Sequence, residues 1–205
     1  MKNPVNTNRR RLLLGMLSLP LAETAWASVL TPRGSEGPFY PTTAMRFDDV
    51  DNNLVKIKGV VTAAGGEIVR LQGRVLDQQG RPVESARVEI WQCDVNGRYL
   101  HRGDSGGQPR DSGFQGFGVD LTNALGEYSF RTIKPGPYPG RTPHIHLKVI
   151  VGGRERLTSQ LYLPDHSLNK RDWLFQNIPS ARRELVTMNF NREPEPIARI
   201  DLHIG

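Results

Sequence analysis

Short runs in which apolar and polar residues alternate recur along the middle of the chain, with Gly, Pro, Asn and Asp between them. Alternation with a period of two is typical of β-strands, because successive side chains of a strand point to opposite faces. The runs predict strands at residues 68–77, 86–94, 126–133, 144–151 and 155–163, followed by a closing strand at 196–204. The pattern therefore predicts antiparallel strands in a sandwich or a barrel.

The fourth and fifth predicted strands form a hairpin whose register can be derived from their apolar faces. These faces coincide only if the loop has an odd number of residues, and Gly152–Arg154 is the natural choice. The resulting register places Gln160 opposite His146 and Tyr162 opposite His144. A two-residue loop would instead place Gln160 beside the apolar core, where burial of a polar amide is unfavourable.

The segments outside these runs lack the alternation. Residues 28–69 combine Pro, Gly and aromatic residues with an acidic stretch, and we interpret them as an N-terminal arm laid over the core. Residues 164–185 have a helical pattern, with Ser167 as a plausible N-cap. Residues 70–205 are predicted to form one β domain, since the length without the first 27 residues suits a single domain.

Residues 1–27 have the pattern of an export signal: a basic patch, a short apolar run and a small-residue cleavage pattern. The apolar run Leu12–Leu21 is only about half of the roughly 20 residues that span a membrane, so we expect no stable membrane anchor. Arg9–Arg11 resembles the twin-arginine signal, and Ala25–Ala27 suggests cleavage before Ser28. We therefore expect a periplasmic or extracellular protein that uses the twin-arginine export machinery; an ordinary general-secretory signal is the alternative.

Charge and cysteine content limit the kinds of partner and the sources of stability that we expect. The formal charge falls from +6 to +3 without residues 1–27, because these contain Lys2 and Arg9–Arg11 but only one acidic residue, Glu23. No dense Lys/Arg stripe with interleaved aromatics is left, so we expect no nucleic-acid partner. Cys93 is the single cysteine, which excludes an intrachain disulfide. Stability must come from a packed core, a metal or subunit contacts, and a homo-oligomer is allowed.

The stretch "KPGPYPGRTPHIHLKV" places one tyrosine and two histidines close together. On a strand, His144 and His146 share one face, so their imidazoles are aimed the same way. Together with Tyr138 on the preceding Pro/Gly-rich turn, they are candidate metal ligands. Zinc would accept two histidines, but tyrosine is a poor partner for it, whereas phenolate oxygen with imidazole nitrogen suits ferric iron. A lone histidine would more often be an ordinary hydrogen-bonded or surface residue.

Four motifs carry a family resemblance: "WQ…GRY", "IKPGPYP", "R-x-x-H-I-H" and "QLY", in this order. With them, most of residues 71–165 resembles the intradiol ring-cleavage dioxygenases, non-haem ferric enzymes of the protocatechuate and catechol type, and "EGPFYP" resembles the N-terminal arm of that family. The resemblance implies a sandwich of two antiparallel sheets, with the iron held between loops and strand ends, an irregular N-terminal arm and short C-terminal helical segments.

The resemblance also implies a ligand set for Fe(III). Tyr99 and Tyr138 would be the two phenolate ligands, His144 and His146 would complete the protein set, and water or hydroxide would take a fifth place. The substrates would be a catechol and O2. The ring would be cleaved between the two hydroxyl-bearing carbons, which gives a cis,cis-muconate-type diacid.

Three residues match catalytic positions of the family. Arg141 matches the active-site arginine and would stabilise developing negative charge on the ring. Gln160 matches the glutamine that supports a ligand histidine. Tyr138 is included because the family's mechanism has one tyrosinate leave the metal and help to accept a proton.

One departure from the family pattern lies between Tyr138 and His144. In protocatechuate- and catechol-type enzymes this segment is longer and commonly carries a tryptophan before the arginine, whereas here "PGRTP" joins the two residues. We therefore expect a more open pocket. The long helical dimerisation segment of catechol-type enzymes is absent from the pattern, which favours an exported, short-chain member of the family.

Two alternatives from other classes stay open. A non-catalytic exported sandwich that binds carbohydrate or protein would use Trp91 and Trp173 as contacts and need no metal. A zinc or copper protein would use His144 and His146 alone and be indifferent to Tyr99. Five basic residues could receive a ring carboxylate and so favour a protocatechuate-like substrate; they are Arg98, Arg102, Arg110, Arg141 and Lys148. A solvated loop is the more common fate of such charges, and chlorinated, hydroxylated or lignin-derived catechols are equally allowed.

Overall fold

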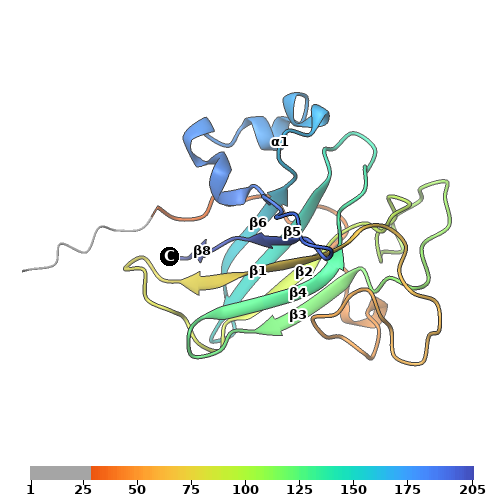
Figure 1. The fold of residues 1–205 in the computed structure, drawn as a ribbon, viewed down its shortest axis with the longest axis horizontal. Helices are drawn as coiled ribbons and strands as arrows, with labels where there is room; N and C mark the ends of the chain where they lie inside the picture. Colours follow the sequence, from red (N-terminus) through yellow and green to blue (C-terminus); the bar gives the residue numbers. More distant parts are fainter. Residues whose placement is uncertain (1–28) are drawn as a thin grey trace, which may run out of the picture.

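Two β-sheets pack face to face in the computed structural model, which describes residues 29–205 (Figure 1). One sheet has the order β3-β2-β5-β6, formed by β2 (Arg87–Trp91), β3 (Phe117–Leu121), β5 (His144–Val151) and β6 (Arg154–Tyr162). The other has the order β4-β1-β7, formed by β1 (Ile68–Leu76), β4 (Glu127–Ile133) and β7 (Ile197–Arg199), and β8 (Leu202–His203) also pairs with β1. The predicted two-sheet sandwich is confirmed. The predicted export signal, and its cleavage before Ser28, lie outside the described residues.

The sheet that contains β1 is mixed, whereas the resemblance had implied two antiparallel sheets. β1 and β4 run antiparallel, but β7 and β8 both run parallel to β1. The closing strand reaches β1 only after the helical segment that follows β6, and such a crossover allows parallel pairing where a tight hairpin does not. The predicted single strand at 196–204 is also interrupted between β7 and β8.

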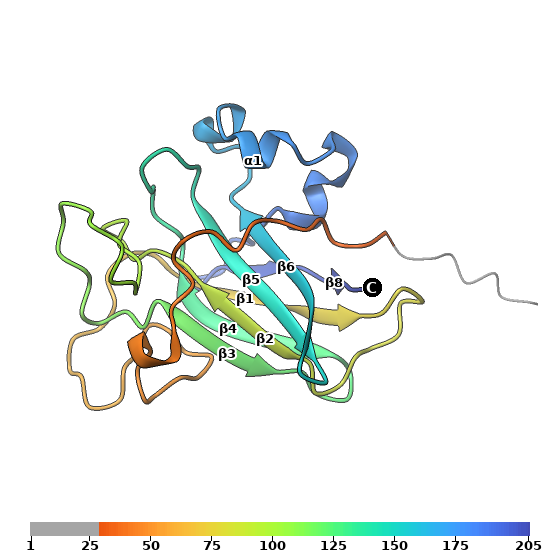
Figure 2. The ribbon, with the colours of Figure 1, turned by 180° about the vertical axis from the view of Figure 1, so that it is seen from behind.

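The strand alternation separates a core face from a face that carries chemistry. On β5, the residues Ile145, Leu147 and Val149 are fully buried in the core between the sheets. The alternate residues therefore point to the outer face of the β3-β2-β5-β6 sheet. Figure 2 shows the N-terminal arm crossing β6 and β5, and Gly34 N donates a hydrogen bond to Thr158 O on β6 at 2.9 Å.

The β5–β6 hairpin has the predicted register but not the predicted loop. Val151 pairs with Arg154, so the turn contains only Gly152 and Gly153. A β-bulge follows, because Val149 pairs with Leu157 while Ile150 pairs with Glu155. Coincident apolar faces require an odd number of unpaired residues in the hairpin, and the one extra residue of the bulge adds to the two residues of the turn. Gly152 and Gly153 both have positive φ, which suits a two-residue turn. The prediction of a three-residue loop was wrong for this reason.

The other elements are short. They are η1 (Thr43–Met45), η2 (Ser167–Lys170), α1 (Trp173–Gln176) and η3 (Ser180–Val186). Ser167 is not the N-cap of η2: His166 takes that position, and its side chain accepts a hydrogen bond from Leu168 N. The sequence pattern did not reveal β3, because it follows a Gly-rich stretch of turn residues. Within residues 29–205, no helix is long and apolar enough to cross a membrane.

Candidate metal centre

The two histidines of β5 face each other through their Nε2 atoms, which lie 3.0 Å apart. Both side chains are almost fully buried. His144 Nδ1 lies 2.7 Å from Thr142 O, and a carbonyl can only accept, so the proton of a neutral His144 is on Nδ1. His144 Nε2 therefore presents a lone pair. The predicted pairing of His144 with Tyr162 and of His146 with Gln160 is confirmed.

Burial keeps these imidazoles neutral. It lowers the pKa of His144 to about 4, and the positive charge of Arg141 contributes in the same direction. Burial also lowers the pKa of His146 well below its ordinary value, and His144 and Arg141 add to this effect. Neutral imidazole is the form that binds metals. Two Nε2 atoms this close need either a hydrogen bond, with the proton of His146 on its Nε2, or a metal ion that binds both.

Tyr99 brings a phenol oxygen to the same point from the loop that follows β2. Its Oη lies 3.3 Å from His144 Nε2, and the side chain is 2 % exposed. Tyr99 N donates a hydrogen bond to Asp104 Oδ2 at 2.6 Å, which fixes the loop. Gly97 is required in the preceding turn, because its φ is +74° and a Cβ there would meet Pro137 O at 2.6 Å. Burial raises the pKa of Tyr99 well above its ordinary value, so only a strong cation would make it a phenolate.

Tyr138 adjoins this group from the turn before β5. Its ring packs edge-on against Tyr99 with centroids 5.5 Å apart, and it also contacts Phe39 of the arm. The turn is closed by Arg141 N, which donates to Tyr138 O at 3.0 Å. Tyr138 is partly exposed, and burial raises its pKa, with Asp104 acting in the same direction. The structure thus places all four predicted ligands in one cluster, with three donor atoms in contact and the Tyr138 ring beside them.

The donor chemistry fits a ferric ion. Among residues 29–205, no group of three or more His, Cys, Asp and Glu side chains could hold a metal. The phenol oxygen in contact with the histidine pair is Tyr99 Oη, 3.3 Å from His144 Nε2. Imidazole nitrogen with phenolate oxygen is a set that suits Fe(III) better than zinc.

Two features that the sequence reasoning missed hold His146 in place. Trp91 stacks on its ring, with centroids 4.9 Å apart and an interplanar angle of 9°. Gly37 of the N-terminal arm also lies against the His146 ring: a Cβ added at Gly37 would lie 3.1 Å from His146 Cε1. The motif "EGPFYP" contains Gly37, so the resemblance carried a signal for this contact. Trp91 is fully buried, which leaves Trp173 as the exposed member of the pair proposed as surface contacts.

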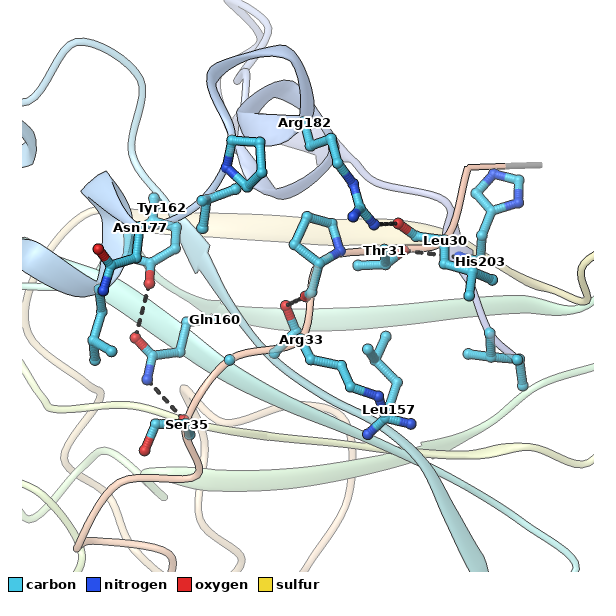
Figure 3. A pocket seen from close by; sticks show the side chains of 18 of the residues that line it. Leu30, Thr31, Arg33, Ser35, Leu157, Gln160, Tyr162, Asn177, Arg182 and His203 are labelled. Atoms are coloured by element: carbon cyan, nitrogen blue, oxygen red, sulfur yellow. Dashed lines mark hydrogen bonds between the residues drawn. The ribbon is translucent and has the colours of Figure 1, made fainter.

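Gln160 and Arg141 belong to one hydrogen-bonded network beside the cluster. Arg141 Nη2 donates to Gln160 Oε1 at 2.7 Å, and Tyr162 Oη donates to the same oxygen at 3.0 Å. Gln160 Nε2 donates to Ser35 O of the arm at 2.7 Å (Figure 3). This network borders a cavity of about 560 Å³ between the arm, β6 and the helical segment. Gln160 lies opposite His146 in the ladder, but its described side-chain hydrogen bonds go to Arg141, Tyr162 and the arm.

Asp172 is the residue of this network that the sequence did not reveal. Its Oδ2 accepts Arg141 Nε at 2.8 Å and Thr142 N at 2.9 Å, and its Oδ1 accepts Phe175 N at 3.0 Å as the N-cap of α1. Burial raises the pKa of Asp172, but the hydrogen bonds from Arg141 and the two backbone N–H groups lower it further, so the net shift is downward. No spacing in the sequence links residue 172 to residue 141, because the contact depends on how the helical segment folds back.

Comparison with known proteins shows which proteins this chain is similar to. The dioxygenase family model (Dioxygenase_C) matches residues 35–203. The beta chain of protocatechuate 3,4-dioxygenase from Burkholderia cepacia is 40% identical over 134 residues, which are 62% of this chain and 57% of that protein. Catechol 1,2-dioxygenase from Acinetobacter baylyi is 29% identical over 195 residues, 82% of this chain and 56% of that protein. The chain spans just over half the length of these relatives.

Solved structures agree with this result. The dioxygenase domain of a dioxygenase and carbohydrate-binding protein fusion from Streptomyces sp. SirexAA-E superposes with a TM-score of 0.64 at 30% identity, covering 85% of this chain and 97% of that one. An intradiol ring-cleavage dioxygenase from Tetranychus urticae superposes with a TM-score of 0.69, covering 87% of this chain and 95% of that one. The identity between this chain and the Tetranychus urticae protein is 23%, so that comparison shows a shared fold alone.

Proposed function

The chain belongs to the intradiol dioxygenase family, and from this premise we propose that it is a non-haem Fe(III) enzyme that cleaves a catechol ring with O2. The product would be a cis,cis-muconate-type diacid. One observation carries the proposal: His144 Nε2 lies 3.0 Å from His146 Nε2 and 3.3 Å from Tyr99 Oη. Such a group of two imidazoles and a phenol supports the expected ferric ligand set.

Tyr99, Tyr138, His144 and His146 would hold the ion. When bound, Fe(III) would supply Lewis-acid chemistry that acidifies the hydroxyl protons of a catechol. The protein's part is to keep the imidazoles neutral and to exclude water, which the burial of both histidines and of Tyr99 provides. The fixed Nδ1–H of His144, held by Thr142 O, keeps that ring in the orientation a ligand needs.

Tyr138 is suited to accept a proton from the substrate. It is the more exposed of the two phenols, and it lies on a turn rather than inside a strand. A phenolate there can move away from its ligand position with little disturbance of the core, whereas Tyr99 is enclosed by its loop. We therefore assign proton acceptance at Oη to Tyr138 and a purely holding role to Tyr99.

Arg141 would stabilise negative charge that develops on the ring. Its guanidinium is held in a fixed orientation by Asp172 and Gln160, so it needs no reorganisation during the reaction. The removal of one such preorganised donor costs about 3 kcal/mol in other enzymes. Gln160 acts here through Arg141, and it links the arginine to the arm.

The alternatives account for less of the site. A binding module that used Trp91 and Trp173 loses one of its contacts, because Trp91 is enclosed in the core. A zinc or copper site on the histidines alone gives no reason for Tyr99 to approach His144 Nε2. We also propose that the protein is exported to the periplasm or beyond through the twin-arginine machinery; this rests on residues 1–27, outside the described residues.

Oxygen uptake tests the function directly. Protein without residues 1–27, reconstituted with ferric iron, is expected to consume one O2 for each catechol and to release the diacid, identified by mass spectrometry. Tyr99→Phe, made as a matched variant that keeps the ring, is expected to lose both activities. Oxygen uptake without a diacid product would contradict intradiol cleavage.

A further inference from the structure

The cavity of about 560 Å³ beside Gln160 lies between the N-terminal arm, β6, the helical segment and β8. Among residues 29–205, its lining includes none of the four predicted metal ligands and not Arg141. Binding sites for small organic molecules have volumes of roughly 300–1,000 Å³. The cavity is therefore a candidate binding site outside the proposed metal centre.

Aliphatic and basic side chains line this cavity together. The aliphatic ones come from the arm, β6 and the helical segment; they are Leu30, Pro32, Leu157, Leu174, Ile178 and Pro179. The basic ones are Arg33, Arg156 and Arg182, and no Asp or Glu side chain of residues 29–205 joins them in the lining. Such a wall suits a molecule with an apolar body and a negative charge.

Arg182 has a donor that no described protein group satisfies. Its Nη2 donates to Leu30 O of the arm, as Figure 3 shows, but its Nε is buried and has no hydrogen-bond partner among residues 29–205. His203 Nδ1 is also buried and unpartnered, and a hydrogen bond of 3.0 Å from Thr31 N to His203 O holds this residue beside the start of the arm. A buried donor without an acceptor is unfavourable, most of all in a charged group. A carboxylate supplies the missing acceptor and pairs with the guanidinium.

The other two arginines lie at the exposed edge of the cavity. Arg33 and Arg156 are exposed to solvent, and Arg33 Nη1 lies 3.9 Å from a carboxylate oxygen of Glu155, so its charge is partly offset. Neither Arg156 nor Arg182 forms an ion pair with another of residues 29–205. The side chains of the cavity therefore carry net positive charge, which raises the local concentration of anions.

The far end of the cavity touches the network that holds Arg141. Gln160 lines the cavity, accepts a hydrogen bond from Arg141 Nη2 and donates one to Ser35 O of the arm, each at 2.7 Å. Figure 3 shows Gln160 and Ser35 side by side at this end. Two residues after Ser35, Gly37 lies against His146. A molecule that fills the cavity therefore packs on the part of the arm that leads to the metal centre.

We infer that this cavity is a second binding site, for a small organic carboxylate that packs its apolar body against the aliphatic wall and binds Arg182 through its carboxylate. The bound molecule holds residues 30–35 of the arm against β6. This inference goes beyond the proposed function, because the site needs neither iron nor turnover.

Calorimetric titration with cyclohexanecarboxylate tests the site, first on iron-free protein and then on iron-loaded protein saturated with catechol in the absence of O2. Cyclohexanecarboxamide controls for shape without charge, and acetate controls for charge without an apolar body. We expect the carboxylate to bind both forms of the protein equally, and each control to bind at least about tenfold more weakly. Equal affinity for the carboxamide, displacement by catechol, or no binding at about 10 mM would overturn the inference. None of these readings depends on ring cleavage, so failure of the proposed function would leave them unchanged.

Arg182→Met tests the assigned residue. Methionine keeps an extended side chain but removes the donors and the charge, so the affinity for cyclohexanecarboxylate is expected to fall about tenfold or more. Arg183→Met is the matched control: Arg183 Nε donates to Ile178 O at 3.0 Å, and Arg183 does not line the cavity, so this variant should bind as the wild type does. Equal losses in the two variants would overturn the role of Arg182.

Hydrogen exchange of the wild-type protein locates the ligand if Arg182→Met does not fold. The amides of Thr31 and Gly34 report on the arm, because their hydrogen bonds go to β8 and β6. With the ligand at about ten times its dissociation constant, both amides are expected to exchange about tenfold more slowly. The amide of Gly80, in the turn after β1, is the control and should exchange at an unchanged rate. Unchanged exchange of Thr31 and Gly34 would overturn the placement of the ligand against the arm.

Discussion

At the scale of single residues, the imidazole pair is the feature that demands an explanation. Two neutral, buried histidines with Nε2 atoms 3.0 Å apart are an unfavourable arrangement unless one Nε2 donates its proton to the other or a metal ion binds both. The sequence predicted that His144 and His146 share a face, because that follows from strand geometry alone. It could not predict that Thr142 O would fix the tautomer, which depends on the path of the turn before β5.

Tyr138→Phe tests the phenol of the turn. The variant is expected to retain iron about tenfold less tightly and to lose on the order of 100-fold in kcat, because it removes the oxygen proposed both as a ligand and as a proton acceptor. Iron content after dialysis and single-turnover rates measure the two effects. Lys148→Ala is the control from the same face of β5 and should change neither, since Lys148 is bound to Glu36 rather than to the cluster. Equal losses in both variants would count against Tyr138 as a ligand.

Arg141→Lys tests the fixed guanidinium. Lysine keeps the charge but cannot hold Asp172 and Gln160 together in one planar fork, so kcat is expected to fall by on the order of 100-fold while iron content is unchanged. Stopped-flow measurement of the oxygen-dependent step separates this loss from weaker substrate binding. A change in iron content alone would mean that Arg141 supports the ligands and not the reaction.

At the scale of elements, the arm and the β5–β6 hairpin build the site together. The register of the hairpin followed from its apolar faces, but a two-residue turn and a bulge achieve it in place of a three-residue loop. The alternation predicts which residues of the two strands pair, but it does not predict whether the extra residue lies in the turn or in a bulge. The arm could be expected from composition, while its contacts with His146 and Gln160 depend on a path that no period in the sequence specifies.

Gly37→Ala tests the approach of the arm to the metal ligands. A side chain at φ +71° is strained by about 1–2 kcal/mol, and its Cβ would press on His146 Cε1 at 3.1 Å, so iron affinity should fall about tenfold. Gly59→Ala is a matched control: φ is +80°, but nothing lies within 4 Å of the added Cβ. Chelator competition compares the two. If Gly59→Ala weakens iron binding as much as Gly37→Ala does, backbone strain and not contact with His146 is responsible.

At the scale of the whole molecule, period-two alternation predicted strands in a sandwich or a barrel, because it is a direct consequence of burying one face of each strand, and the resemblance implied the sandwich. The mixed character of one sheet was not predictable in this way, because the direction of β7 and β8 depends on the crossover that precedes them. Tyr138, His144 and His146 were candidate ligands from their spacing, and Tyr99 was added through the resemblance. Neither the strand pattern nor the resemblance revealed Asp172, because its partner Arg141 is far away in the chain.

The single thiol reports on the integrity of the whole fold. Burial raises the pKa of Cys93 to about 12, so the folded state keeps the thiol protonated, whereas the unfolded state ionises near its ordinary value. Stability from this group is complete below about pH 9 and is lost as the pH rises toward 12. At pH 8, labelling of native protein should be about 1000-fold slower than labelling in denaturant, as measured with a chromogenic disulfide. Rapid labelling of the native protein would show that the buried cluster of Cys93 with Trp91, Tyr99 and Phe117 is open.

The central claim is that two histidines and two tyrosines hold a ferric ion which a catechol can reach. The visible spectrum of purified protein without residues 1–27, loaded with iron and titrated anaerobically with catechol, tests it most directly. The account predicts a red-brown tyrosinate-to-iron band that shifts as the diol binds and that weakens in Tyr99→Phe. Protein that stays colourless after iron reconstitution and is unchanged by the diol would contradict the claim.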